Sequence, residues 1–358
     1  MDMKRDYYED IQLLDSKVLW FWFLLLIASL IVFPFLVLGI KGSSYYIYVA
    51  NYMAINVIVT VGLNILVGYT GQISLGHAGF FAIGAYATVL SMNHLHLPFI
   101  LALFLGALIA AFFGFLLGLP ALRLEGPYLA IATLGFGMAV TQVIGRWQIF
   151  GGRMGIEAPP LDLLQPFGSY VLITDLQRYF LIISIGFFLI WAARNLMKTR
   201  VGRAFIAIRD SDIAAQTMGV DLTLYKTLAF AVSAFYTGIA GGLMAFLLGF
   251  INPSSFNFIL SIYFLAFVIV GGLGSIFGSI MGGMVMTWLM LELEKVQELP
   301  FLGSLLLSFS ERWMNVSGIP NIASIIFGLI IILIVVFEPL GLYGFWIRTK
   351  IYWKTWPF

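Results

Sequence analysis

The sequence RNLMKTRVGRAFIAIRDSDIAAQTMGVDLTLYK, residues 194–226, forms a polar island between two long apolar stretches. It holds six of the chain's nineteen Lys and Arg residues. Inside it, Asp210 or Ser211 can cap a short helix, and Gly219 can end that helix in a left-handed turn. Such a helix has about seven residues and a length of roughly 10 Å. Because isolated helices shorter than about 12–15 residues are marginal in water, we expect another surface to pack on this one.

The composition of the chain places it in the class of integral membrane proteins. Of its 358 residues, 61% are hydrophobic and 10% are charged, and the mean hydropathy is +1.00. There is no Cys, which excludes disulfides and thiolate metal sites. No small-residue cleavage site follows the first apolar run, so we expect a retained span rather than a signal peptide. We divide the chain into a cytoplasmic segment (1–17), a transmembrane domain (18–340) and an interfacial cytoplasmic tail (341–358).

Hydropathy predicts an all-α, polytopic membrane protein of about ten transmembrane helices. Three of the predicted spans, the third, sixth and eighth, are shorter than the usual ~20 residues. The ten spans are residues 18–40, 46–68, 79–92, 99–118, 128–145, 179–193, 227–248, 258–271, 276–293 and 322–338.

The distribution of Lys and Arg predicts that both termini lie in the cytoplasm. With the N-terminus inside, the inner segments hold thirteen Lys and Arg residues and the outer segments hold six. The six outer residues are Lys41, Arg146, Arg153, Arg178, Lys295 and Arg312. The island at 194–226 then becomes a cytoplasmic loop, and the simplest account of it is a solvated basic loop that obeys the positive-inside rule.

No Asp, Glu, Lys or Arg lies in the middle of any predicted span. Ionisable groups at that depth cost at least ~2.5–3.5 kcal/mol and are kept by proton and ion relays that need them. A proton-driven carrier is therefore disfavoured, and the energy source is expected to lie outside this chain. The chain also lacks the GxxxxGK[ST] phosphate loop, so we do not expect it to hydrolyse ATP.

Small residues recur at helical spacing in two places. Gly106, Ala110, Gly114 and Gly118 do so in the fourth span, and Gly274, Gly278 and Gly282 do so at the ninth. Such ladders allow close helix packing in lipid, more often within one chain than between chains. The ladders are 168 residues apart, and Tyr-Thr-Gly at 69–71 recurs at 236–238, which predicts two inverted halves of five spans.

The stretch GYTGQISLGHAG, residues 68–79, is the most unusual apolar-embedded segment. Four glycines and the polar residues Gln72, Ser74 and His77 lie directly between two spans. Irregular backbone at membrane depth is tolerated only inside protein or beside a water-filled path. We therefore predict a broken helix near a translocation path, with an ordinary cytoplasmic turn as the alternative.

The string GQISLGHAGFFAIGAY, residues 71–86, strongly resembles branched-chain amino acid permeases of the LivM/LivH family. The resemblance covers most of residues 45–340, including FGG at 150–152 with Gly-Ile at 155–156, and GGLGS at 271–275. In the island, Ala214-Ala215-x-x-x-Gly219 resembles the EAAxxxG signature of importers driven by ATP-binding cassette (ABC) ATPases. Ile213 stands where that signature has Glu, with Asp212 just before it.

The resemblance implies an importer subunit and its partners. These partners are a second permease of the LivH type, two cytoplasmic ABC ATPases, an extracytoplasmic binding protein and the lipid bilayer of the inner membrane. It implies that the island couples to an ATPase. The coupling residues are then Arg203, Arg209, Asp210, Asp212, Ala214, Ala215, Gly219 and Lys226.

The predicted translocation path combines the broken segment with polar stripes on two helices. One stripe is Asn56, Thr60 and Asn64 on the second span, and the other is Thr133, Gly137 and Thr141 on the fifth. Interhelical hydrogen bonds would explain these residues as well as a path lining does. The predicted path residues are Gly71, Gln72, Ser74, Leu75, Gly76, His77, Asn56, Thr60, Asn64, Thr133 and Thr141.

Two other functions remain open. The same architecture could import urea or a short amide instead of Leu, Ile and Val. An intramembrane enzyme has only His77, His94 and His96 as candidate groups, without a paired acid and base or a nucleophile constellation. His94 and His96 are spaced i, i+2 with no carboxylate near them, which disfavours a metal site. No cofactor and no nucleic-acid partner are predicted.

Overall fold

The structure is a computed structural model that describes residues 17–41, 44–124, 126–162, 171, 174–296, 320–338 and 340–355. The chain divides into two units, residues 1–49 and 50–358. Residues 1–16 of the predicted cytoplasmic segment 1–17, and Arg312 of the predicted outer residues, lie outside the described residues.

The first unit contains α2 (Lys17–Lys41) and the start of α3 (Tyr45–Thr70). The helix α2 is apolar over Trp20–Gly39, where its mean hydropathy is 2.8. It has no acidic residue in its first turn and carries Pro34 inside. Twenty such residues at 1.5 Å each span the ~30 Å hydrocarbon core of a bilayer.

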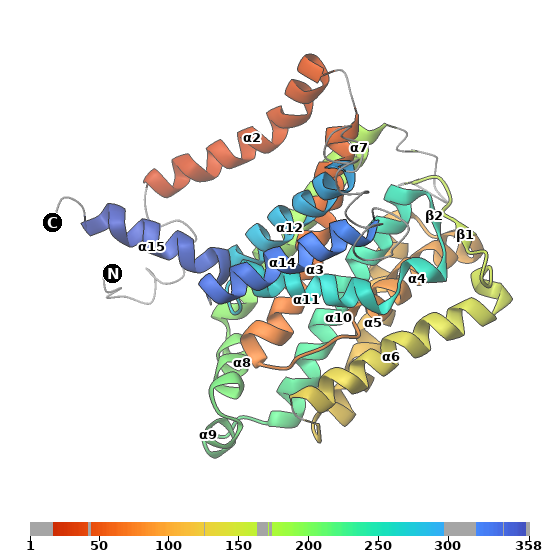
Figure 1. Cartoon of the computed structure of the whole chain (residues 1–358). Coiled ribbons are helices and arrows are strands. Elements are labelled where there is room, and N and C mark those ends of the chain that lie inside the picture. The colour runs from red at the N-terminus through yellow and green to blue at the C-terminus, as the bar shows by residue number, and fades with distance from the viewer. Residues whose placement is uncertain are drawn as a thin grey trace, which may run out of the picture. The chain divides into compact units, whose positions relative to one another are not determined.

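The second unit is almost entirely helical (Figure 1). After α3, its helices are α4 (His77–Leu95), α5 (Phe99–Ala121), α6 (Pro127–Arg146), α7 (Asp175–Lys198), α8 (Arg200–Asp210), α9 (Asp212–Thr217), α10 (Leu222–Leu248), α11 (Phe258–Gly271), α12 (Ile276–Val296), α14 (Pro320–Phe337) and α15 (Gly341–Thr355). The short elements are η1 (Gln148–Phe150), β1 (Ile156–Glu157), β2 (Phe250–Ile251) and η2 (Pro253–Ser255).

All ten predicted spans coincide with helices, and the prediction of an all-α polytopic membrane protein is confirmed. Among the described residues, eight helices are long and apolar enough to cross a membrane. The predicted ends were wrong where polar residues continue a helix beyond its apolar part. The sixth span, predicted at 179–193, is part of the 24-residue α7. That helix starts earlier because Thr174 accepts from the Gln177 backbone N–H at 3.4 Å while the Gln177 side chain accepts from the Thr174 N–H at 3.3 Å.

The core of the second unit is formed by α4, α5 and α10, which pack tightly on one another. A Cβ added at Gly84 would lie 2.2 Å from the Gly238 carbonyl oxygen, and one at Gly114 would lie 2.5 Å from Ala234 Cβ. The glycine ladder on α5 therefore serves packing within the chain. The second ladder does the same between α11 and α12, where a Cβ at Gly282 would lie 2.2 Å from the Phe267 carbonyl oxygen.

The predicted sequence markers of two inverted five-helix halves do not occupy equivalent positions in the structure. Helices α3, α4, α5 and α6 have 26, 19, 23 and 20 residues. Their counterparts α10, α11, α12 and α14 have 27, 14, 21 and 18. Tyr69 lies at the end of α3, whereas Tyr236 lies in the middle of α10. The tripeptide match is therefore coincidental, and the inverted repeat stays a prediction.

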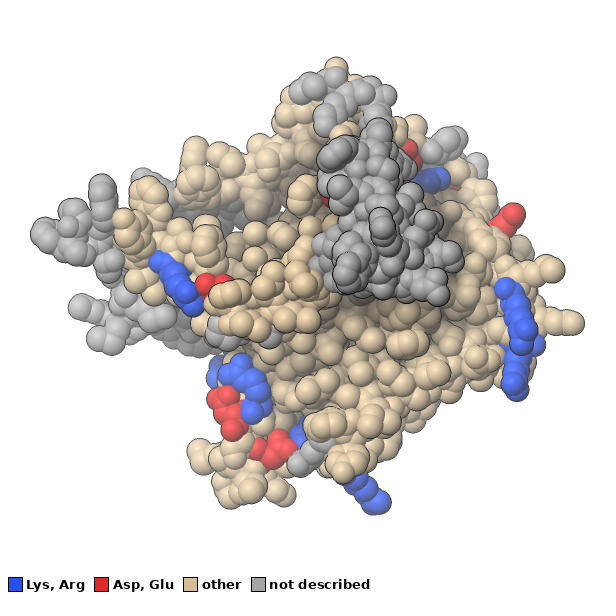
Figure 2. All heavy atoms as spheres, viewed as in Figure 1, with Lys and Arg blue, Asp and Glu red and all other residues tan. Residues whose placement is uncertain are grey.

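Charged side chains gather at the ends of the second unit (Figure 2). On the face shown, they lie over α8 and α9, near α15 and at the far end of α6, with a broad band free of Lys, Arg, Asp and Glu between them. Such a band is the distribution expected of a chain that spans a bilayer, because charges are costly at membrane depth. We refer to the end with α8 and α9 as the island end.

Candidate translocation path and coupling site

The predicted break is the segment Gly71–Gly76, which joins the end of α3 to the start of α4. Gly71 has a φ of +72°, a left-handed conformation that strongly favours glycine. The Gln72 N–H still donates to the Leu66 carbonyl at 3.2 Å, but the Leu75 N–H donates to Thr133 Oγ1 at 2.9 Å. The backbone thus leaves the helix and finds its partners on neighbouring helices.

This segment rises from the island end into the interior of the helical unit. Ala78, just after it, donates its N–H to Ser261 Oγ at 2.9 Å, and His77 bonds to Ser233 at 2.7 Å. At 1.5 Å per residue, Ser233 lies about 16 Å along α10 from Leu222. Ser261 lies about 15 Å along α11 from its last residue, Gly271. Helix α4 therefore begins in the interior of the helical unit, at a depth comparable with half of a ~30 Å hydrocarbon core.

The polar side chains of the segment are buried and hold it in place. Ser74 Oγ lies 3.0 Å from His77 Nδ1, and Ser233 Oγ lies 2.7 Å from His77 Nε2. All three side chains are completely buried. Because both ring nitrogens are satisfied, the imidazole ties the segment to α10. A buried polar group without such partners would cost about 1–3 kcal/mol.

The segment has two faces, as extended backbone does. Gln72, Ser74 and Gly76 are buried, whereas Gly71 and Ile73 are exposed and Leu75 is half-buried. Ile73 is 39% exposed. The outward side chains of this polar-looking motif are therefore apolar, and the inward ones are polar.

Two glycines press the segment against α6. A Cβ at Gly76 would lie 2.4 Å from the Thr133 carbonyl oxygen, and one at Gly79 would lie 2.9 Å from Gly137 Cα. Thr133 is buried on α6 and meets the segment directly, whereas Thr141 bonds only its own helix, to the Met138 carbonyl at 2.9 Å. Of the two predicted threonines on α6, the structure brings Thr133 but not Thr141 to the segment.

The stripe on α3 joins that helix to α12. The Asn56 amide donates to Thr287 Oγ1 at 3.0 Å, and the Thr60 hydroxyl donates to the Ser279 carbonyl at 3.0 Å. Asn64 donates to Ser279 Oγ at 2.6 Å and accepts from the Gly274 N–H at 2.9 Å. Interhelical hydrogen bonding, one of the two explanations that the sequence left open, accounts for all three residues.

The island folds into α8 and α9. Ser211 caps α9 by accepting from the Ala214 N–H at 3.3 Å, and Gly219, with a φ of +83°, follows its end. The predicted short helix is confirmed at six residues. Ala215 is only 2% exposed, whereas Ile213 and Met218 are 78% and 84% exposed. Of the small pair of the motif, Ala214 is therefore exposed and Ala215 is buried. The large apolar side chains of Ile213 on α9 and of Met218 at its C-cap protrude.

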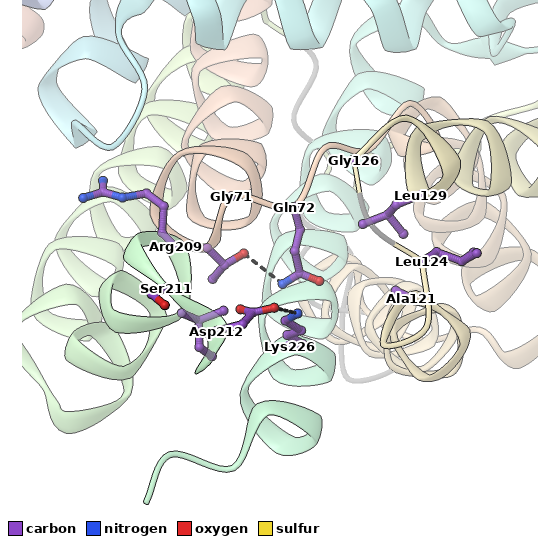
Figure 3. Close-up of a pocket in the computed structure, with 12 residues that line it drawn as sticks. Gly71, Gln72, Ala121, Leu124, Gly126, Leu129, Arg209, Ser211, Asp212 and Lys226 are labelled. Carbon is purple, nitrogen blue, oxygen red and sulfur yellow. Dashed lines mark hydrogen bonds and ion pairs between the residues drawn. The ribbon is translucent and has the colours of Figure 1, made fainter. Parts of the chain in front are cut away.

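The broken segment and the island meet in one cavity of about 240 Å³ (Figure 3). Lys226 pairs with Asp212 across it, and the Arg209 guanidinium donates to the Gly68 carbonyl at 3.3 Å and pairs with Asp210 at 3.0 Å. Arg203, in contrast, bonds only to the nearby Lys198 carbonyl, at 3.3 Å, and does not line the cavity. The cavity lining combines residues of the two predicted sites: Gly71 and Gln72 from the path, and Arg209, Asp212 and Lys226 from the coupling group.

A two-stranded antiparallel sheet of β1 and β2, at the other end, was not predicted. Ile156 pairs with Ile251 and Glu157 with Phe250, in antiparallel register. A Cβ at Gly155, whose φ is +88°, would lie 2.2 Å from the Ile251 carbonyl oxygen. Two-residue strands carry too little alternation to be recognised in sequence; the glycines at 151, 152 and 155 were the available signal. Trp147, Ile149 and Met154 are exposed beside this two-stranded sheet.

Two of the three candidate histidines, His77 and His96, lie at opposite ends of α4. His77 contacts two Ser hydroxyls but no carboxylate, and complete burial closes this group to a substrate. His96 ends α4 in a left-handed conformation with a φ of 49°. Among the described residues, no group of three or more His, Asp or Glu side chains could hold a metal ion.

We expect Ser233→Ala to destabilise the protein because it leaves His77 Nε2 buried without a partner. The loss of unfolding free energy is about 1–3 kcal/mol, visible as a lower Tm in detergent. Ser184→Ala is the matched control, because Ser184 is exposed, whereas Ser233 is buried, and its hydroxyl donates to the Phe180 carbonyl of its own helix. Equal Tm values for the two variants would contradict a bracing role of His77.

Comparison with known proteins places these features in one family. The family model of the permease component of branched-chain amino acid transport systems matches residues 45–292. The chain is 35% identical over 282 residues to the high-affinity branched-chain amino acid transport system permease protein LivM of Salmonella typhimurium, and 34% identical to that of Escherichia coli. Each alignment covers 73% of this chain and 65% of the relative, so the chain spans just under two thirds of the length of these relatives.

A more distant relative and the solved structures complete the comparison. The probable branched-chain amino acid transport permease protein LivH of Methanocaldococcus jannaschii is 31% identical over 163 residues, which cover 44% of this chain and 49% of that protein. No solved structure matches. The broken segment and the island both lie inside the matched range 45–292, and the chain belongs to the family of branched-chain amino acid transport system permease components.

Proposed function

We propose that this chain is the permease subunit of a binding-protein-dependent ABC importer that moves Leu, Ile and Val across the cytoplasmic membrane. Separate ATPase subunits drive it, and a second permease of the LivH type completes the transmembrane part. The observation that carries this proposal is the juxtaposition of an extended segment at membrane depth, Gly71–Gly76, with an exposed helix, α9, through one cavity.

The two-faced segment suits the passage of a small aliphatic amino acid. The side chains of Ser74 and His77 are satisfied inside the chain, so they hold the backbone without trapping a zwitterion. Its outward side chains, Ile73 and Leu75, are apolar and would meet an aliphatic side chain. Affinity would then reside mainly in the binding protein.

The island supplies a mechanical link between an ATPase and this segment. A partner that moves α9 also moves Asp212, its first residue, and through it Lys226 on α10. Arg209, at the end of α8, bonds the Gly68 carbonyl three residues before Gly71. Movement at α9 would therefore reach α10 through the ion pair, and movement passed on to α8 would reach the end of α3 through the Arg209 hydrogen bond.

Uptake by the reconstituted system tests this function. We expect proteoliposomes that contain both permeases and the ATPases, with binding protein outside and ATP inside, to accumulate labelled leucine. Urea and acetamide serve as competing substrates for the alternative function. Accumulation of urea without accumulation of leucine, isoleucine or valine would overturn the substrate class and keep the architecture.

Single cysteines test the proposed orientation, since the natural chain has none. Gln148, the site of the first substitution to Cys, is exposed near the two-stranded sheet of β1 and β2. Gln216, the site of the second, is exposed on α9 at the island end. In intact cells, an impermeant thiol reagent should label the first at least ~10-fold faster than the second, because the bilayer excludes charged reagents. The reverse order would invert the topology and remove α9 from the ATPase.

A further inference from the structure

The cavity at the island end contains a buried polar atom that nothing in the described chain satisfies. Gln72 is 6% exposed, and its Oε1 has no hydrogen-bond partner among the described residues. The amide nitrogen of the same side chain donates to Thr70 Oγ1 at 2.9 Å. A buried amide oxygen without a partner costs about 1–3 kcal/mol, so a donor in the cavity would stabilise this arrangement.

The direction of the amide follows from the hydrogen bonds of Thr70. The Thr70 hydroxyl gives its only hydrogen to the Leu66 carbonyl at 2.6 Å. It can therefore only accept from Gln72, which places Nε2 toward Thr70 and turns Oε1 away from it. In Figure 3 the Gln72 side chain descends from the segment toward the Asp212–Lys226 pair, with its oxygen on the side of Ala121.

The walls of the cavity present two kinds of chemistry. On one side lie Asp212 and Lys226, whose mutual bond uses one of the three Lys donors and one of the two carboxylate oxygens. The Arg209 guanidinium points away from this pair (Figure 3), so Lys226 is the cation that faces a ligand there. On the other side lie Ala121, Leu124 and Leu129.

We propose that this cavity binds a free zwitterionic α-amino acid with a small aliphatic side chain, and holds the transported solute at the exit of the path. The carboxylate pairs with Lys226, and the ammonium group donates to Gln72 Oε1 and Asp212. The side chain packs on Leu124 and Leu129. The volume of about 240 Å³ is below the ~300–1,000 Å³ of sites for drug-sized ligands and suits a small solute.

The inference deepens the proposed function and rests on it for the identity of the solute. Gly71 and Gln72 are the first residues of the broken segment, so a solute that leaves the segment at the island end enters this cavity. Asp212 belongs to α9 and Lys226 to α10, so the same ligand touches the link to the ATPase.

Equilibrium binding to the whole transporter, without the binding protein, tests the site. The probe is labelled L-leucine added to the detergent-solubilised complex, with L-leucinamide and 4-methylpentanoate as competitors that each lack one charged end. We expect saturable leucine binding and competition at least ~10-fold weaker by either analogue, the effect of losing one hydrogen bond to a charged group. No saturable binding, or equal competition by all three compounds, overturns the proposal.

Variants locate the binding. Gln72→Leu should weaken leucine binding at least ~10-fold by removing the acceptor. Leu124→Trp should weaken it similarly by filling the cavity from a half-buried position, and it keeps the test valid if Gln72→Leu does not assemble. Gln142→Leu is the control, because Gln142 is exposed near the far end of α6. Unchanged binding in Leu124→Trp would overturn this location.

The uptake assay separates this inference from the proposed function. Leucine uptake without binding-protein-independent leucine binding removes the exit site and leaves the importer. Saturable leucine binding without leucine uptake keeps the site and overturns the assigned transport substrate.

Discussion

Replacing Ile213 and Met218 together by Glu should abolish substrate-stimulated ATP hydrolysis while membrane insertion remains intact. Both side chains are more than three-quarters exposed on α9, a helix too short to be stable by itself. If each is buried against an ATPase subunit, each contributes about 1.5–3 kcal/mol. Loss of both corresponds to roughly 10²–10⁴ in affinity. The measurements are ATPase activity with loaded binding protein and co-purification of the ATPase.

The matched control for this double variant is Gln216→Glu, which adds a charge to an exposed residue of the same helix without removing an apolar side chain. It should retain the ATPase. Ala215→Trp and Gly219→Pro should also lose stimulated activity, but for a different reason. Ala215 is buried and Gly219 has a positive φ, so these changes distort α9 itself. Normal stimulated activity in the Ile213/Met218 double variant would remove α9 as the docking element.

The sequence predicted the helices well because the bilayer imposes a strong constraint. Each span must be apolar and helical, which composition records directly. Helix ends were predicted less well, since α7 and α10 continue through polar residues such as Arg194 and Tyr225. Capping by Thr174 and Asp221 sets their starts, and hydropathy does not report on capping.

The irregular segment was predicted in position, but the directions of its side chains were not. The glycines and polar residues of GYTGQISLGHAG marked an irregular segment. Sequence alone did not show that His77 contacts Ser233, because these two residues lie 156 positions apart. The burial of Lys226 was not predicted either. If the island is a solvated basic loop, Lys226 is expected to be exposed, but the structure buries it beside Asp212.

Substitution of Gly76 is the second change for which we expect a large effect, here on uptake. A Cβ at this position would lie 2.4 Å from the Thr133 carbonyl oxygen, closer than real Cβ contacts come. Its φ of −100° is open to any residue, so the penalty of substitution is steric and not conformational. Either the segment or α6 must move to admit even a methyl group, and overpacking of this kind costs about 1–3 kcal/mol or more.

We therefore expect Gly76→Phe to reduce leucine, isoleucine and valine uptake at least ~100-fold, because ~3 kcal/mol of overpacking displaces the segment that we propose lines the path. Basal ATPase activity and subunit assembly should remain, since α9 lies elsewhere. Gly76→Ala should give a smaller loss and keeps the test informative if the Phe variant does not assemble. Gly328→Ala on α14 is the control, because a Cβ there meets nothing within 4 Å. Full uptake of all three amino acids by an assembled Gly76→Phe transporter would show that the translocation route runs elsewhere.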